Sequence, residues 1–404
     1  MRSIAFLLSL GLIFVIPFQN VVEVPGLGTI AKGIGLVAML FWVLTVLNER
    51  RVRRPTAFHG AVLVYVAWNA VSLVWSIDVP ETLERTLTYV QLFGLVYIVW
   101  DLCSTRSAVC AAFQAYVLGA YVSVANQLLN YGSGVAEVTN RYTATGFNSN
   151  MLALILGLGM PLAWYLVVAP PGERPASRLL RLVNLAYLPA ALFAILLTAS
   201  RAGFFGILPV FVLVLYSVGR MRFRLAALAL GVAAALAALV IALVPQASFD
   251  RLAKTGSVVR EGTWNDRLAI WRETGDIIAE NPLLGTGAKS HRMAARQTQK
   301  VAHNFALSIL SELGVVGFLL FLVPFALAAR EVREMPRHEW SVWLTVLAIW
   351  LLNNATHDFD YAKQTWLLLG MAVASARASR PPAGARAEVL TAGGHAMPAP
   401  AHGR

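Results

Sequence analysis

Long apolar runs separated by short polar connections dominate the pattern of this chain. The runs that are long enough, or nearly long enough, to cross a bilayer fall at residues 4–18, 27–47, 56–75, 86–103, 108–129, 149–168, 183–198, 203–218, 225–245, 304–329, 340–353 and 365–377. A helix needs about 20 mainly apolar residues to cross the hydrocarbon core, so the pattern predicts about twelve transmembrane helices. The predicted fold class is an all-α integral membrane protein.

Basic residues alternate between these predicted helices. Every second connection is rich in arginine: Arg50, Arg51, Arg53 and Arg54; Arg106; Arg174, Arg178 and Arg181; Arg220, Arg222 and Arg224; Arg330, Arg333 and Arg337; and Arg377 and Arg380 after the last run. The intervening short connections hold few basic residues: Arg85, Arg141, Arg201 and Lys363. Arginine-rich connections stay on the cytoplasmic side, so we expect a multi-pass protein with both termini in the cytoplasm.

This topology divides the chain into four parts. Residues 1–245 carry the first nine predicted helices, and 304–380 carry the last three. Between them, 246–303 form a long outer loop that we expect to be partly helical. Residues 381–404 are rich in Ala, Pro, Gly and Arg, which predicts a disordered cytoplasmic tail.

Composition supports the membrane interpretation and limits the partners. The chain is 58% hydrophobic and 13% charged, which is too apolar for a soluble protein. Its net charge of +12 would suggest a nucleic-acid partner in a soluble chain. Here the arginine-rich inner connections account for the charge, so we expect membrane lipids around the protein and no nucleic acid.

Arginines on the outer side work against this orientation rule and so point to chemistry. Arg201 lies in "LLTASRAGFFG", a tight turn between two apolar runs, and Arg141 lies in another short connection on the same face. A guanidinium in a poorly solvated place needs an anionic partner, and it binds phosphate through two parallel hydrogen bonds. Arg292 belongs to the same outer group in the long loop.

The loop also contains a predicted amphipathic helix, "TWNDRLAIWRETGDIIAENP". Its apolar face is expected to consist of Trp264, Leu268, Trp271, Gly275 and Ile278, which repeat at spacings of three and four. Arg267 flanks this face one turn from each tryptophan. The helix is expected to pack on the membrane domain and in doing so to aim Arg267 inward.

The segment "KVAHNFALSILSELGVVGF" places His303 and Asn304 at the mouth of a membrane helix. Glu312 lies about 13 Å further along that helix, too deep to act on a lipid headgroup. It either holds a cation from a neighbouring helix, such as Lys32, or stays neutral and hydrogen-bonded.

Polar residues on the outer side also include the sequence "THDFDYAK", with His357, Asp358 and Asp360. A His-Asp-x-Asp sequence invites a metal site, but the cluster is short and local, which favours a polar turn. The sequence holds no other metal-binding constellation or nucleotide loop on a plausible face. We therefore expect no cofactor and no metal.

Four stretches together resemble the bacterial O-antigen ligase and polymerase superfamily. They are "RLAIWRETGDIIAENPLLGTGA", "AHNFALSILSELGVVGF", "NRYTATGFNSNMLALIL" and "LTASRAGFFG". The resemblance implies an all-helical fold like that of the C-type glycosyltransferases, with a periplasmic loop domain between helices 9 and 10. It also implies an inner-membrane enzyme of lipopolysaccharide biosynthesis, whose donor is a glycan on undecaprenyl pyrophosphate and whose acceptor is a sugar hydroxyl of lipid A-core.

Carried over residue by residue, His303 matches the family's histidine, and Arg201, Arg267 and, less closely, Arg141 match its arginines. The chemistry agrees with these matches. The arginines would neutralise the charge that develops on the pyrophosphate as the anomeric bond breaks, and His303 would be the base for the acceptor hydroxyl. Asn304, Trp271 and Arg292 are weaker candidates for orienting or binding substrate.

Two alternatives remain open at the level of sequence. An O-antigen polymerase or a protein O-oligosaccharyltransferase of the same superfamily would differ only in the acceptor. A transporter or flippase of lipid-linked glycans belongs to another class. It would be expected to carry charges near the middle of its helices, whereas the charges here cluster at one face.

Overall fold

The computed structural model describes residues 1–26, 28–136, 141–169, 177–219 and 263–380, together with isolated positions at 231, 238, 242, 246 and 249–250. Its elements are almost all helical. They are α1 (Arg2–Val15), η1 (Ile16–Phe18), β1 (Glu23–Val24), β2 (Gly28–Thr29), α2 (Ile30–Glu49), α3 (Ala57–Val71), η2 (Ser72–Val74), α4 (Val79–Leu102), α5 (Arg106–Gly132), α6 (Ser149–Val168), α7 (Arg178–Leu197), α8 (Arg201–Gly206), α9 (Leu208–Val218), α13 (Thr263–Glu280), α14 (His291–Ala294), α15 (Phe305–Arg333), α16 (Arg337–Asn354) and α17 (Lys363–Ala378).

Seven of the described helices are long and apolar enough to cross a membrane. These are Ile30–Glu49, Ala57–Val74, Arg106–Gly132, Ser149–Val168, Arg178–Leu197, Arg201–Val218 and Phe305–Arg333. Large apolar side chains on their outer faces are exposed, for example Leu36, Leu47 and Val212. The chain is thus an all-α, multi-pass membrane protein, and the predicted fold class is confirmed at that level. The predicted helix at 225–245 and the predicted tail at 381–404 lie outside the described residues.

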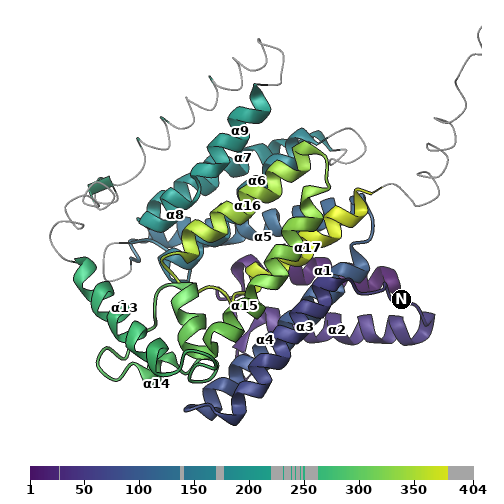
Figure 1. Ribbon diagram of the computed structural model, residues 1–404. Helices are drawn as coiled ribbons and strands as arrows, with labels where there is room; N and C mark the ends of the chain where they lie inside the picture. The colour runs from purple at the N-terminus through teal and green to yellow at the C-terminus, as the bar shows by residue number, and fades with distance from the viewer. Residues whose placement is uncertain are drawn as a thin grey trace, which may run out of the picture.

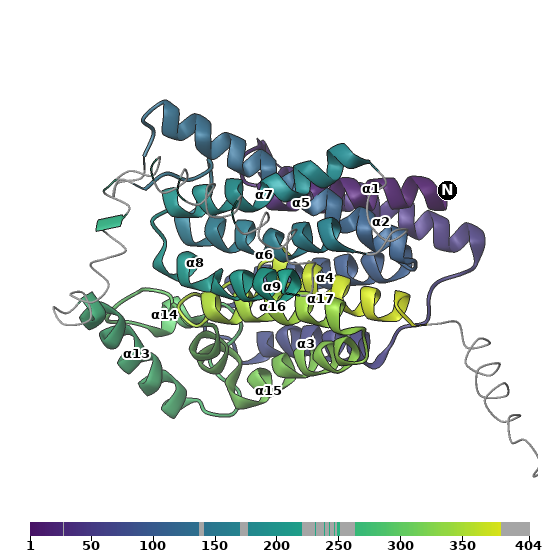
Figure 2. The same cartoon turned by 90° about the horizontal axis from the view of Figure 1, so that it is seen from above.

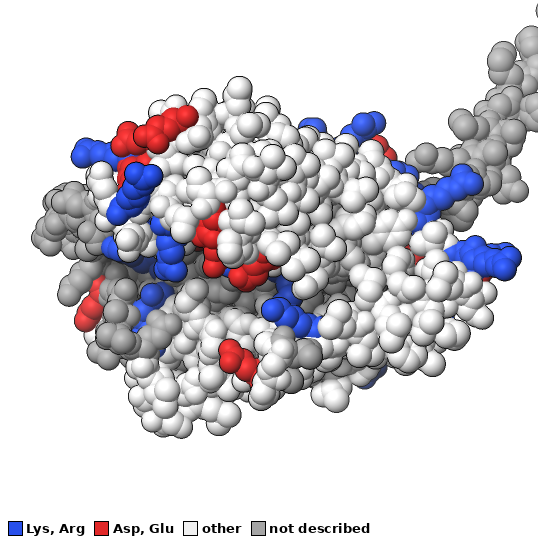
Figure 3. Space-filling view, turned by 90° about the horizontal axis from the view of Figure 1, so that it is seen from below, with Lys and Arg blue, Asp and Glu red and all other residues white. Residues whose placement is uncertain are grey.

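The helices run roughly side by side, and α13 and α14 lie at one end of them (Figures 1 and 2). We call the end that carries α13 and α14 the loop end, and the other the opposite end. On the side shown in Figure 3, charged side chains gather in groups, and most of the remaining surface carries none. This distribution is the one expected of helices that meet lipid.

Helix α6 lies at the centre of the bundle, and nearly all of its residues from Leu152 to Leu166 are buried. It packs against α5, α7, α8 and α16. Small residues allow the close approach: a Cβ at Gly159 would lie 2.6 Å from the Tyr187 hydroxyl, which itself donates to the carbonyl of Leu156.

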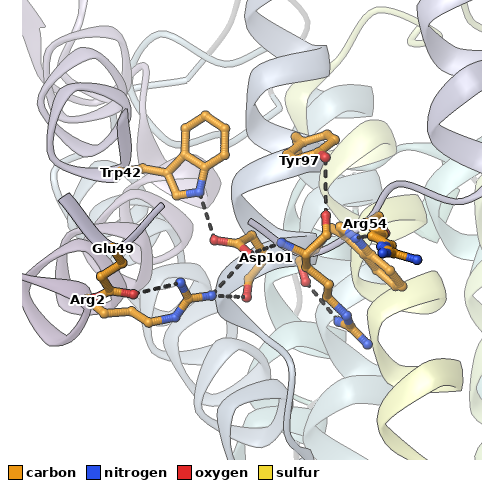
Figure 4. Close-up of polar contacts among 8 residues, drawn as sticks. Arg2, Trp42, Glu49, Arg54, Tyr97 and Asp101 are labelled. Atoms are coloured by element: carbon orange, nitrogen blue, oxygen red, sulfur yellow. Dashed lines mark hydrogen bonds and ion pairs between the residues drawn. The ribbon is translucent and has the colours of Figure 1, made fainter. Parts of the chain in front are cut away.

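At the opposite end, a buried aspartate, Asp101, links several segments through hydrogen bonds (Figure 4). Its carboxylate accepts hydrogen bonds from the Arg2 guanidinium at 3.0 Å, the Trp42 indole at 3.0 Å and the Arg53 backbone N–H at 2.8 Å. Arg2 also pairs with Glu49 at 3.3 Å. Residues from α1, α2, the connection after α2 and α4 are thereby fixed together.

Two helices differ from the runs that predicted them. Arg85 does not lie in a connection: it is a buried residue inside α4, which begins at Val79, seven residues before the apolar run. The run at 203–218 forms two helices, α8 and α9, which meet at Ile207. An apolar run predicts only the part of a helix that meets lipid or the core, so it leaves out a polar first turn. In α4 that polar turn is capped by Asp78, whose side chain accepts a hydrogen bond from the Glu81 N–H.

Helix α15 is also broken, at Gly314, where φ is 68° and ψ is −173°. The carbonyls of Ser311 and Glu312 accept hydrogen bonds from the N–H groups of Thr286 and Gly287. The loop that precedes α14 thus inserts into the helix like a short strand. It supplies partners for the backbone groups that the break leaves free.

Candidate functional site

The predicted site residues come from separate elements that meet at the loop end. Arg141 precedes α6, Arg201 is the first residue of α8, Arg267 lies on α13, and His303 lies two residues before α15. Both α6 and α15 begin at this end, so the positive ends of their dipoles face the site.

Asn150 connects the two arginines of the short connections. Its Oδ1 accepts a hydrogen bond from the Arg141 guanidinium at 3.1 Å and another from the Ser200 hydroxyl at 2.7 Å. Arg141 also donates through Nε to the carbonyl of Thr198 at 2.8 Å. Ser200 caps α8 by accepting from the Gly203 N–H, which fixes the backbone of its neighbour Arg201.

Helix α13 turns Arg267 toward the bundle, but with a different apolar face from the predicted one. Ile270, Thr274 and Ile277 are buried, whereas Leu268 is 40% exposed. The expected face was therefore wrong by one residue, which is about 100° around the helix. Arg267 lies one turn before Ile270 on the buried side and is half-buried.

Trp271 and Asn304 position the segment that carries His303. The Trp271 indole donates to the carbonyl of Ala302 at 3.0 Å. The Asn304 side chain caps α15 by accepting from the N–H groups of Ala306 and Leu307, and its amide donates to the carbonyl of Ala355 at 2.9 Å. His303 itself has φ of 50°, a left-handed conformation that is strained in a non-glycine residue.

The site is electropositive. Burial lowers the pKa of Arg267, and the nearby charge of Arg201 lowers it further. Burial also lowers the pKa of the His303 imidazole, with additional contributions from Arg267 and Lys300. These mutual effects require the groups to lie close together, and they keep His303 neutral and able to accept a proton at neutral pH.

Arg292 stands apart from this group. It lies on α14, is exposed, and donates through Nε to the carbonyl of Gln299 at 3.3 Å within the same loop. The contact braces the loop backbone, and in the part of the chain that the structure describes no hydrogen bond or ion pair joins Arg292 to the other arginines.

The His-Asp-x-Asp sequence separates into two different environments. Asp360 turns into the bundle, where it accepts from the Tyr89 hydroxyl at 2.7 Å and lies 3.6 Å from the Arg85 guanidinium. His357 instead packs against Phe359, with the rings 5.2 Å apart and nearly parallel. Among the described residues, no group of three or more His, Cys, Asp or Glu side chains is placed to hold a metal ion.

Glu312 has a role that differs from the one expected with Lys32. Its Oε2 accepts the backbone N–H of Lys289 at 2.8 Å, which anchors the inserted loop to α15. The Lys289 ammonium lies 2.8 Å from Glu84 on α4. Glu312 therefore anchors the inserted loop, and the cation of a neighbouring helix that lies near it is Arg85 of α4 rather than Lys32.

Sequence reasoning missed Asn150 and underrated His357. Asn150 lies in the quoted segment "NRYTATGFNSN", but an asparagine before a helix is common and carries no signal by itself. His357 is buried and electrostatically coupled to Arg267, His303 and Arg141, which only the fold reveals.

The fold and this site define a multi-pass helical membrane protein with a group of cationic side chains at its loop end. Residues 186–322, which contain Arg201, Arg267 and His303, match the model of the O-antigen ligase family. A protein of Rickettsia conorii (strain ATCC VR-613 / Malish 7) described as a candidate polysaccharide ligase is 25% identical over 293 residues, which are 66% of this chain and 66% of that protein. The resemblance of this chain to the bacterial O-antigen ligase family is thereby confirmed.

Proposed function

We propose that this protein is a glycosyltransferase that moves a glycan from undecaprenyl pyrophosphate to a sugar hydroxyl of lipid A-core. The observation that carries the proposal is the gathering of Arg141, Arg201, Arg267 and His303, from four separate segments, at one end of a membrane bundle. A glycan on a lipid pyrophosphate presents its reacting carbon beside two phosphates at headgroup depth, and it needs fixed cations there.

In the proposed reaction the acceptor oxygen attacks the anomeric carbon, and the bond from that carbon to the pyrophosphate breaks. The pyrophosphate keeps the electron pair. Arg201 and Arg267 stabilise the charge that develops on it. Arg141 has two of its nitrogens engaged with Asn150 and Thr198, so we assign it mainly to fixing the backbone around this site.

His303 takes the proton of the acceptor hydroxyl or holds that hydroxyl in line. A histidine suits this role because its neutral form accepts a proton near neutral pH. Trp271 and Asn304 support His303 through the backbone contacts described above. The site as a whole would face the periplasm, with 246–303 as a loop domain over it and both termini in the cytoplasm.

The test is a reconstituted reaction with purified protein in liposomes and lipid-linked O-antigen as the donor. Lipid A-core and a second lipid-linked glycan unit are offered together as competing acceptors. We expect a glycan–lipid A-core product and release of undecaprenyl pyrophosphate. Elongation of the second lipid-linked unit instead would identify a polymerase. Movement of the donor across the bilayer without any transfer would identify a flippase.

A further inference from the structure

His357 offers a hydrogen-bond acceptor that the proposed mechanism does not yet use. It lies in the connection between α16 and α17, and only 5% of its surface is exposed. Its Nδ1 lies 3.0 Å from the carbonyl oxygen of Asn353. A carbonyl can only accept, and the Thr356 hydroxyl, 3.1 Å from Nδ1, can accept as well. We therefore assign the proton to Nδ1, which leaves Nε2 of the neutral ring as an acceptor.

That Nε2 atom is buried and has no hydrogen-bond partner among the described residues. A buried polar atom without a partner costs free energy, and such atoms in native proteins usually have a reason to exist. Stacking against Phe359 and the bond to Asn353 together fix the direction of the ring. The acceptor is therefore held in place in advance of any donor.

His303 is a neighbouring ring that carries an N–H, and its charge is among those that lower the pKa of His357. The bond from Asn304 to the carbonyl of Ala355 ties the residue after His303 to a position two residues before His357. No hydrogen bond in the described part of the chain fixes the His303 ring. A base is effective when a third group orients it and selects its tautomer, and His303 lacks that group unless His357 supplies it.

We propose, on the basis of the function proposed above, that His357 is the positioning residue for His303: its buried Nε2, which has no partner in the described part of this structure, accepts the N–H of the His303 ring when the acceptor hydroxyl is bound. The other nitrogen of His303 then faces the acceptor hydroxyl. When the proton moves from that hydroxyl to His303, the ring becomes a cation, and the Asn353 carbonyl stabilises it through His357. The sugar never touches His357, which agrees with the burial of Nε2.

The electrostatics support His303 as the donor and His357 as the acceptor. Burial and the charges of Arg267, His303 and Arg141 lower the pKa of His357 to about 4, so its ring stays neutral and able to accept at working pH. His303 is faced by Arg267, Lys300, His291 and His357, all neutral or cationic. An acceptor favours the charged form of the ring that donates to it, so His357 raises the pKa of His303 above the value it would otherwise have.

The test compares His357→Gln, which keeps an acceptor oxygen near the position of Nε2, with His357→Phe, which keeps the stacked ring and removes both nitrogens. In the reconstituted reaction the parent rate falls toward low pH as His303 becomes protonated. We expect the Phe variant to lose on the order of a hundredfold in rate, with this fall moved to lower pH. The Gln variant should stay within about tenfold of the parent and keep the parental pH profile. Donor binding should be unchanged in both.

His59→Phe is the matched control, because His59 is equally buried with an unpartnered Nε2 but lies at the opposite end. It should leave the rate and the pH profile unchanged. If the Phe variant does not fold, His357→Asn, whose amide is too short to reach the Nε2 position, replaces it in the comparison with Gln.

Two results would overturn the inference while the parent still transfers glycan. One is a Phe variant with the parental rate and pH profile. The other is a Gln variant as inactive as the Phe variant, which would make His357 itself the proton acceptor. A parent that transfers to neither acceptor removes the proposed function, and this inference with it.

Discussion

At the scale of single residues, the position of an arginine around helix α13 decides whether its side chain faces the bundle. Arg267 and Arg272 lie on the same helix, but Arg267 is half-buried on the side that faces the bundle and Arg272 is exposed. The charge of Arg201 lowers the pKa of Arg267, so these two guanidinium groups lie close enough to interact. Two cations held together in this way repel, and an anionic ligand relieves that repulsion.

Arg201→Ala and Arg267→Ala are each expected to reduce glycan transfer on the order of a hundred- to a thousandfold, because each removes a donor to the developing negative charge. Arg→Lys at either position should recover part of the rate, since the charge remains but the bidentate geometry is lost. The measurement is the initial rate in liposomes at matched protein levels. Arg272→Ala serves as the control and should behave like the parent. If both Ala variants transferred at the parental rate, the pyrophosphate assignment would be wrong.

Sequence predicted Arg201 and Arg267 from the motifs and the orientation rule, and His303 from its motif and its place at the mouth of a helix; the roles of all three stay predictions. It placed the apolar face of α13 one residue away because tryptophans dominate any count of apolar spacing, whereas burial also takes in Thr274. It ranked His357 as an ordinary turn residue because the charged groups that lower its pKa, Arg267, His303 and Arg141, are distant in sequence. Packing brings such distant residues together, and their proximity leaves no local pattern in the sequence.

At the scale of elements, the break in α15 depends on glycine at two facing positions. Gly314 has φ of 68°, and Gly285 in the inserted loop also has φ of 68°. A Cβ at Gly285 would lie 2.4 Å from the backbone of Glu312. This distance is a steric clash that only a backbone movement could relieve. The sequence predicted one uninterrupted helix here, because apolarity continues through the break and only the inserted loop explains it.

Gly285→Ala is therefore expected to lower stability and to displace the loop that leads to α14. Left-handed backbone in a non-glycine residue costs about 1–2 kcal/mol, and the clash adds to this. The measurement is the melting temperature of the purified protein in detergent, followed by the transfer rate. Gly275→Ala is the matched control: it lies inside α13 with nothing within 4 Å of a new Cβ, so it should stabilise by up to about 1 kcal/mol. An equal melting temperature for the two variants would contradict the packing of loop against helix described here.

At the scale of the whole molecule, the two ends of the bundle carry opposite kinds of arginine. Those at the opposite end are neutralised or solvent-facing: Arg2 pairs with Glu49 and Asp101, Arg106 with Glu339, and Arg377 with Glu331. Those at the loop end include Arg201 and Arg267, whose charges add to one another. A rule based on arginine counts predicts which end faces the cytoplasm, but it does not reveal that Arg201 and Arg267 lie close enough for their charges to interact.

This difference makes orientation the most consequential prediction for the whole molecule. The arginines of the opposite end follow the orientation rule, so we expect that end in the cytoplasm and the loop end in the periplasm. Alkaline phosphatase fused after residue 290 should therefore be active, and fusions after 52, 222 and 390 should be inactive. β-Galactosidase fused at the same positions should give the reverse pattern, which controls for poor expression. Phosphatase activity at 222 would overturn the assignment. The cationic site would then face the cytoplasm, where a periplasmic acceptor such as lipid A-core is not presented, and the acceptor assignment would fall with the topology.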